Sequence, residues 1–227
     1  MCGRFTLTHP TEALARLFDA APANDLPPGP RFNISPTQPV AAVVSDPGGG
    51  QDGQQGGRRL TTMRWGFVPS WYDRPGAGPL LINARAEGIA DTPAFRAAAR
   101  TRRCLIPASG FYEWTTEDDG KQPWYIHPPG GEVLALAGVW QVWERDGTRL
   151  VTCAIVTCAA NAALSALHHR MPVVIAPADQ ALWLGEAGHG AARLMRPAPD
   201  DALAVRKVGR AVNANRADGA ALLEAVP

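Results

Sequence analysis

Apolar residues fall in short runs along the chain, and Gly, Pro and Asp interrupt these runs. Runs of this length and composition are typical of β-strands separated by turns. The segments with strand character are residues 39–45, 60–71, 103–114, 123–128, 133–144, 149–160 and 172–176. A tight glycine turn is expected inside 103–114. The runs 123–128, 133–144 and 149–160 follow one another closely, which favours an antiparallel meander.

Apolar residues at helical spacing predict helices between these strands. Residues 11–20 carry such a pattern, and Thr11 can cap its start. Residues 91–103 form a second helical segment, with Thr92 as the cap and Pro93 as the first helical residue. Shorter elements are expected at residues 161–168, 178–186 and 200–206.

Two segments lie outside these elements. The proline-rich stretch 21–38 cannot sustain a helix, because proline lacks an amide N–H and clashes with the preceding turn. Residues 46–59 hold no apolar residue to bury, so we expect a mobile loop within the domain. Strands dominate, and helices lie between them. The predicted fold class is α+β, one domain over residues 1–227 with a curled, largely antiparallel, barrel-like sheet and peripheral helices.

The composition is that of a globular chain. Of the 227 residues, 46% are apolar and 19% are charged, which suits one well-buried domain. No apolar run approaches the roughly 18 residues of a membrane span, and the N-terminus lacks the apolar stretch of a signal peptide, so we expect a cytoplasmic protein. The net charge of +1 argues against a general polyanion binder. Nearly all the positive charge is arginine, however, whose planar fork suits phosphate oxygens.

The cysteines show neither a disulfide framework nor zinc spacing. Cys104, Cys153 and Cys158 lie in apolar runs and are expected to be buried thiols. Cys2 differs, because removal of Met1 would leave it with an α-amine and a thiol on adjacent carbons. Such a 1,2-aminothiol condenses with an aldehyde to an imine, and the thiol then closes a five-membered thiazolidine. An α-amine has a pKa of about 7.8 and a thiol of about 8.5, so both are partly deprotonated near neutrality.

Three further stretches place polar residues in apolar or aromatic surroundings. Asn83 and Arg85 point to the same face if LLINARAEG is extended. Glu113 lies between two aromatic residues, where desolvation would raise its pKa toward the range useful for proton transfer. His168 and Arg170 belong to a His-His-Arg cluster before a buried strand, and histidine titrates near neutrality. Taken singly, each stretch is also compatible with a purely structural role.

Together with the N-terminus, these stretches resemble the SOS response-associated peptidase family, also called the abasic-site processing family. The resemblance runs in the family's order from residue 2 to about residue 175. Its blocks are Met1-Cys2-Gly3-Arg4, Trp65-Gly66 with Pro69 and Trp71, Asn83-Ala84-Arg85-Ala86-Glu87, Pro107-Ala108-Ser109-Gly110-Phe111-Tyr112-Glu113-Trp114, Thr157-Cys158-Ala159-Ala160-Asn161 and His168-His169-Arg170-Met171-Pro172, with a tail at Val212-Asn213. Six blocks in order are far more specific than any one block.

The resemblance implies a sensor of abasic sites in single-stranded DNA that links itself covalently to them during the DNA damage response. An abasic site exposes a ring-opened deoxyribose aldehyde, the electrophile that a 1,2-aminothiol requires. Cys2 would supply both the amine and the thiol of the cross-link. This lyase-like cross-linking reaction would shield the abasic site. Asn83 would orient the sugar and the Cys2 amine. Glu113 would shuttle protons as the carbinolamine loses water, and His168 would assist ring opening and reversal. His169 occupies a variable position and receives no role.

The same resemblance implies which residues contact DNA. These are Arg4, Trp65, Arg85, Trp114, Thr157 and Arg170. The arginines would clamp phosphates, the tryptophans would stack on bases or wedge the strand into a bend, and the threonine would touch the backbone. The resemblance implies no metal or other cofactor. Nothing in the sequence suggests other than a monomer, and we expect it to be cytoplasmic, and associated with the nucleoid when bound to DNA.

The family name further implies a peptidase-like hydrolysis, which we interpret as self-removal of Met1, although ordinary methionine aminopeptidase could also remove it. Two other functions stay open. An N-terminal-nucleophile amidohydrolase also needs a free Cys2 and would turn over a small amide. A non-covalent single-strand-binding domain would use the arginine and tryptophan content, and would bind intact and abasic strands equally well.

Overall fold

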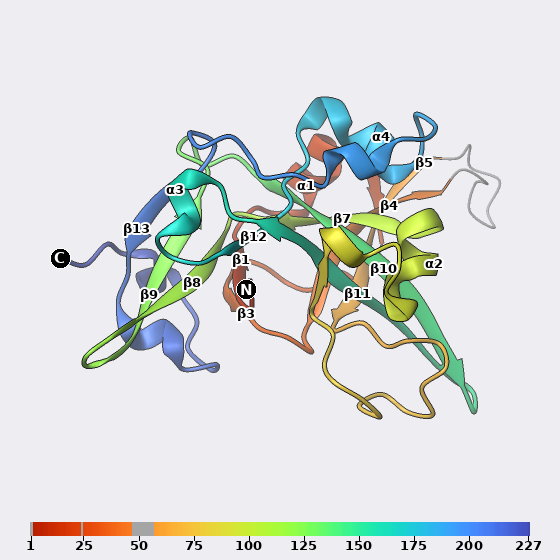
Figure 1. Cartoon of the computed structure of the whole chain (residues 1–227), viewed down its shortest axis with the longest axis horizontal. Coiled ribbons are helices and arrows are strands. Elements are labelled where there is room, and N and C mark those ends of the chain that lie inside the picture. Colours follow the sequence, from red (N-terminus) through yellow and green to blue (C-terminus); the bar gives the residue numbers. More distant parts are fainter. Residues whose placement is uncertain (1, 24, 47–56) are drawn as a thin grey trace.

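The computed structural model describes residues 2–23, 25–46 and 57–227, and its longer strands belong to two sheets (Figure 1). The smaller sheet has the order β13-β9-β8-β1-β3, formed by β1 (Phe5–Leu7), β3 (Arg31–Ile34), β8 (Gly110–Glu117), β9 (Gly120–His127) and β13 (Ala204–Lys207). The larger sheet has the order β12-β11-β10-β7-β4-β5-β2, formed by β2 (Ala20–Pro22), β4 (Pro39–Asp46), β5 (Gly57–Trp65), β7 (Arg103–Ala108), β10 (Leu134–Arg145), β11 (Thr148–Ala159) and β12 (Arg170–Pro172). The short β6 (Asn83–Arg85) pairs with β11.

The larger sheet closes on itself. β5 and β11 pair in parallel, with Cys153 opposite Trp65, so the path β5-β4-β7-β10-β11 returns to its start. The other neighbours along this path are antiparallel. Closure pairs the strand edges and encloses a core of inward-facing side chains. The predicted α+β class with a barrel-like sheet is therefore confirmed.

The helices lie around the barrel, as expected. They are α1 (Thr11–Phe18), α2 (Pro93–Thr101), α3 (Ala162–Ser165) and α4 (Gln180–Leu184), and short 3-10 turns occur at Ala86–Gly88, Pro177–Asp179, Ala191–Leu194, Arg210–Asn213 and Ala220–Leu223. Pro93 begins α2 directly after Thr92, as predicted. The expected cap at Thr11 was wrong, because Pro10 precedes the helix and Thr11 is its first residue. Among the described residues, no helix is long and apolar enough to cross a membrane.

The predicted meander is split between the two sheets. β10 and β11 form the expected antiparallel hairpin, but β9 pairs with β8 and β13 instead of with β10. The connection 128–133 contains two prolines and two glycines and carries the chain from one sheet to the other. The proline-rich segment 21–38 was expected to be a loop, yet it contains β3, which lies beside β1.

Two strand boundaries also differ from the prediction. Only Arg170–Pro172 forms β12, and the rest of the predicted strand 172–176 makes an isolated bridge at Val174. In the predicted loop 46–59, residues 47–56 lie outside the described residues. Residues 57–59 pair with β4 as the beginning of β5, so the strand extends further than the glycine content indicated.

Candidate active site

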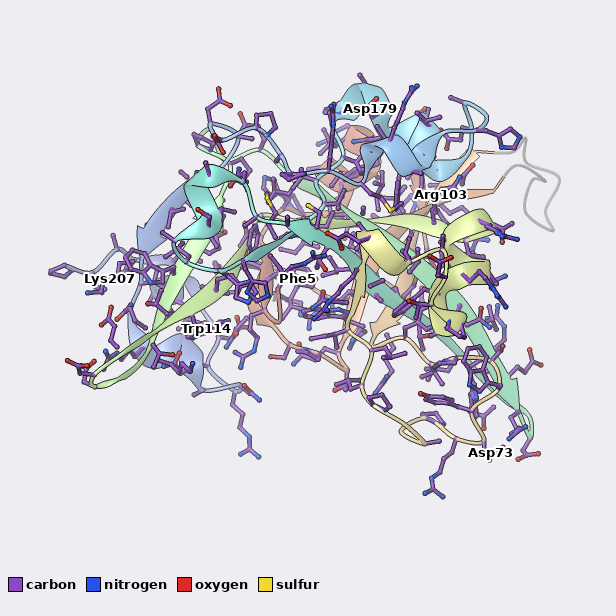
Figure 2. The ribbon with its side chains drawn as sticks, in the orientation of Figure 1. Phe5, Asp73, Arg103, Trp114, Asp179 and Lys207 are labelled. Atoms are coloured by element: carbon purple, nitrogen blue, oxygen red, sulfur yellow. The ribbon has the colours of Figure 1, made fainter. Side chains whose placement is uncertain are left out.

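The N-terminal segment holds Cys2 inside the protein. Phe5 pairs with β3 on one side and with β8 on the other, and Figure 2 draws Phe5 near the middle of the molecule. The Tyr112 N–H donates to the Arg4 carbonyl oxygen at 3.0 Å. This pairing directs the start of the chain toward Glu113, the next residue of β8. Cys2 is consequently 0% exposed.

β6 places the Asn83 side chain next to Cys2. Ala84 is buried between the more exposed Asn83 and Arg85, the alternation expected of an extended segment. Asn83 Nδ2 donates to the Cys2 carbonyl oxygen at 3.0 Å, although the two residues are 81 positions apart. Asn83 Oδ1 is buried and has no hydrogen-bond partner among the described residues. A buried unpaired acceptor costs about 1–3 kcal/mol, so this oxygen is suited to a donor on a bound group.

Glu113 interacts electrostatically with both Cys2 and His168. The Glu113 side chain is buried, and burial raises its pKa, while the charge of His168 lowers it in part. Burial likewise raises the pKa of the Cys2 thiol, and the negative charge of Glu113 raises it further. Burial therefore opposes the partial ionisation expected of an exposed aminothiol. We refer to Cys2, Asn83, Glu113 and His168 as the Cys2 cluster.

His168 is held in one tautomer by the residue two positions later. The Arg170 N–H donates to His168 Nδ1 at 2.9 Å, and an amide N–H can only donate. The Arg170 carbonyl oxygen lies 3.1 Å from the same nitrogen, but the amide contact is the shorter one and favours Nδ1 as the acceptor, with the proton of the neutral ring on Nε2. The ring of His169 stacks on that of His168 with centroids 4.3 Å apart, and His168 lowers the pKa of His169.

Arg170 is engaged by protein acceptors. Its two terminal nitrogens donate to the two carboxylate oxygens of Glu87 at 2.7 and 2.8 Å. The Thr157 carbonyl oxygen accepts a further bond from Arg170 at 2.7 Å. Thr157 itself is 0% exposed in this structure, so its contact with the DNA backbone stays a prediction. Thr157 lies on β11, between β6 and β12.

Trp65 belongs to the core. It is 0% exposed, its Nε1 donates to the Ile82 carbonyl oxygen at 2.9 Å, and its ring meets Phe5 edge to face at 5.2 Å. Its DNA contact stays a prediction, because the ring is buried in this structure. The cause is barrel closure, which pairs Trp65 with Cys153. Trp71, in the connection between β5 and β6, is 54% exposed.

Arg4 and Trp114 are covered by the C-terminal segment 210–215. The Arg4 guanidinium lies 5.8 Å from the Trp114 ring centroid and donates to Asn33 Oδ1 at 2.7 Å and to Asn215 Oδ1. Burial lowers the pKa of Arg4. Trp114 Nε1 donates to Asn213 Oδ1 at 2.7 Å. Both side chains are half-buried, whereas Arg85 is exposed.

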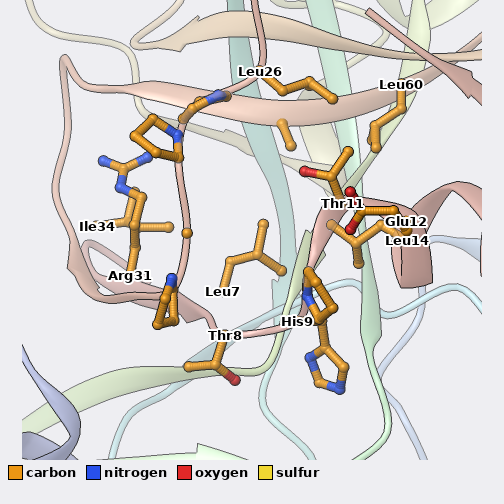
Figure 3. Close-up of a pocket in the computed structure, with 16 residues that line it drawn as sticks. Leu7, Thr8, His9, Thr11, Glu12, Leu14, Leu26, Arg31, Ile34 and Leu60 are labelled. Carbon is orange, nitrogen blue, oxygen red and sulfur yellow. The ribbon is translucent and has the colours of Figure 1, made fainter.

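A cavity of about 270 Å³ lies elsewhere, between β1, α1 and the proline-rich segment (Figure 3). Its lining includes Leu7, His9, Leu26 and Arg31. No member of the Cys2 cluster lines this cavity, so it is separate from the candidate active site.

Comparison with known proteins identifies the family. A family profile described as SOS response associated peptidase (SRAP) matches residues 1–215. The chain belongs to this family. "Abasic site processing protein YoaM" of Bacillus subtilis (strain 168) is 34% identical over 233 residues, covering 99% of this chain and 98% of that protein. "Abasic site processing protein YedK" of Escherichia coli (strain K12) is 28% identical and covers 100% of both chains. A crystal structure from Bacteroides thetaiotaomicron has the same fold, with a TM-score of 0.84 at 19% identity over 100% of both chains.

Sequence reasoning missed part of this SRAP site. Glu87 was quoted within a family block but received no role, because its ion pair joins residues 83 positions apart. Asn33 and Asn215 also went unnoticed, since their contact with Arg4 depends on where the chain ends fold. Among these features, the sequence contained a signal only for the C-terminal segment, because the family resemblance included Val212-Asn213.

Proposed function

We propose that this chain recognises abasic sites in single-stranded DNA and cross-links to them through Cys2 once Met1 is removed. The observation that carries the proposal is the contact of Asn83 with Cys2 beside the buried Glu113. This arrangement surrounds the future N-terminal amine and thiol with groups that orient reactants and transfer protons. The family assignment and the names of its relatives support the same substrate.

The reaction conserves atoms and protons without any other reactant. The Cys2 amine adds to the sugar aldehyde carbon and gives a carbinolamine. Glu113, whose pKa is raised by burial, protonates the departing hydroxyl, so water leaves and an iminium ion forms. The thiol then returns a proton to the Glu113 carboxylate while its sulfur bonds to the same carbon. The C=N electron pair moves to nitrogen, and a neutral thiazolidine results.

The other members of the Cys2 cluster fit supporting roles. Asn83 Oδ1 is the acceptor for the Cys2 amine, because it is buried and lacks a partner among the described residues. His168 offers Nε2–H, since its Nδ1 is occupied by a backbone amide. We assign to His168 the proton that the thiazolidine needs when it reopens.

We assign DNA contacts by exposure. Arg85 is exposed on the same strand as Asn83 and fits a phosphate contact beside the abasic sugar. Trp71 is exposed and offers a surface for base stacking, in place of the buried Trp65. Trp114 keeps its proposed stacking role at the border of the C-terminal segment. Arg4 and Arg170 donate hydrogen bonds to acceptors within the protein, and we assign them the role of positioning the segments around the site.

We further propose that the Cys2 cluster releases Met1. The same proton transfers would assist hydrolysis of the bond before Cys2. Intact mass of a recombinant Glu113→Gln variant, expressed while methionine aminopeptidase is inhibited, tests this proposal. Retention of Met1 in the variant and its loss in the wild type would support self-removal. Retention in both would assign the step to the aminopeptidase.

The deciding experiment for cross-linking uses a single-stranded oligonucleotide with one excised uracil. We expect a heat-stable adduct on a denaturing gel, formed equally well in excess chelator. A tetrahydrofuran analogue, which lacks the aldehyde, is the matched control and should form none. Turnover of a small amide without an adduct would favour the amidohydrolase. Equal binding of intact and abasic strands without an adduct would favour a non-covalent binding domain.

A further inference from the structure

The Glu87–Arg170 ion pair crosses the central strand of the site. Glu87 follows β6, and Arg170 begins β12. These two strands flank β11 on opposite edges, where Thr157 pairs with Arg85 on one side and with Pro172 on the other. The ion pair therefore connects the strand that carries Asn83 to the strand that follows His168.

The arginine end of this pair is fixed in place. Its side chain is 11% exposed, whereas that of Glu87 is 57% exposed. Arg170 Nε is buried without a hydrogen-bond partner among the described residues. A largely buried guanidinium that loses its carboxylate is costly, although exposed ion pairs contribute little. The bidentate geometry with Glu87 thus determines where this guanidinium lies.

The position of Arg170 controls the ring of His168. The Arg170 N–H donates to His168 Nδ1 at 2.9 Å, and the Arg170 carbonyl oxygen lies 3.1 Å from the same nitrogen. A small shift of this backbone would exchange donor for acceptor at Nδ1. The ring would then carry its proton on Nδ1, and Nε2 would lose its hydrogen.

We propose that Glu87 is a positioning residue: through its bidentate contact with Arg170 it holds the beginning of β12 so that His168 keeps Nδ1 as an acceptor and Nε2 protonated. Glu87 touches neither Cys2 nor the DNA in this role. The positioning of His168 is independent of the proposed function. Only its expected consequence, the rate at which His168 helps to reopen the adduct, rests on that function.

The test compares Glu87→Gln with Glu186→Gln. Glu186 makes a similar bidentate contact with Arg58, with Nε and Nη2 donating at 3.0 and 2.8 Å, in a pair that includes no member of the Cys2 cluster. Imidazole ¹⁵N spectra measure the tautomer, and the signals that disappear in His168→Gln are those of His168. In wild type these two signals should correspond to one protonated and one unprotonated nitrogen. In Glu87→Gln the two His168 signals should move toward each other, because both tautomers are populated. Glu186→Gln should leave them unchanged.

The second readout is release of DNA from the adduct during a chase with competing abasic strand. Glu87→Gln should slow release roughly tenfold, less than loss of a general acid or base itself. Unchanged His168 signals, or changed signals with wild-type release, would overturn the proposal. If wild type forms no adduct, the proposed function fails, and the spectra alone then support or overturn the positioning role. Circular dichroism verifies that each variant is folded.

Discussion

Cys2 and Glu113 are both buried, and burial raises the pKa of each. Burial disfavours the ionised form of each group, so a single proton can pass between them during the reaction. This differs from a surface aminothiol, whose thiol would be partly ionised. The chemistry proposed for this SRAP chain therefore depends on a carboxyl group that can alternate between donor and acceptor.

Substitutions of Cys2 separate the imine from the thiazolidine. Cys2→Ser keeps the amine, so we expect an imine that borohydride traps but little heat-stable adduct, because a hydroxyl closes the ring poorly. Cys2→Ala should likewise give only a trappable imine. Denaturing gels with and without borohydride measure both. A heat-stable adduct from Cys2→Ser at the wild-type level would remove the thiazolidine from the mechanism.

Glu113→Gln should slow adduct formation by roughly ten- to a thousandfold, around the lower part of the ~10²–10⁴-fold range of general acid–base assistance. Glutamine keeps the size of the side chain but cannot exchange a proton with the carbinolamine or the thiol. Single-turnover rates on an abasic strand provide the measurement. A wild-type rate in a folded variant would show that solvent moves these protons.

His168→Ala should still form the adduct, because Glu113 serves the forward steps. It should release the DNA more slowly when a competing abasic strand is added, since the reopening thiazolidine loses its proton donor. His169→Ala is the matched control, because that ring stacks on His168. Release at the wild-type rate from His168→Ala would exclude the residue from reversal.

β6 presents two kinds of side chain to one face of the barrel: Asn83 toward Cys2, and Arg85 toward solvent. Arg85→Ala should weaken binding of intact and abasic strands alike. The dependence of log affinity on log salt should flatten by about 0.7 for one lost phosphate contact with a single strand. Arg100→Ala, an exposed arginine on α2, should not change this slope. An unchanged slope in Arg85→Ala would assign the residue to structure.

The stability of the whole protein should depend on Glu113 in a pH-dependent way. The folded-state pKa of Glu113 is raised, so its contribution to stability is complete below the unfolded-state value of about 4.3 and is lost as the pH rises through the folded-state value. Glu113→Gln should therefore unfold at a higher urea concentration than wild type at pH 8, and the difference should shrink toward pH 4. Glu132→Gln, at an exposed position, should show no such trend. The opposite trend would contradict the raised pKa.

Much of this protein could be predicted because local patterns carry the information. Apolar runs between turn residues predict strands such as β4, β10 and β11, and Thr92-Pro93 indicates where α2 begins. The buried thiols of Cys104, Cys153 and Cys158 follow from their apolar neighbours. The 1,2-aminothiol of Cys2 follows from its position in the chain. These features depend on residues that are adjacent in sequence.

Other features were decided only when distant segments met. Barrel closure pairs β5 with β11 and buries Trp65, which its sequence block indicated as a DNA contact. The Glu87–Arg170 ion pair forms because β6 and β12 lie on opposite edges of β11. No pattern in one segment shows which residues another segment will cover. Burial, and with it the pKa of Cys2 and Glu113, is a property of the folded chain, because it depends on the water that distant residues exclude.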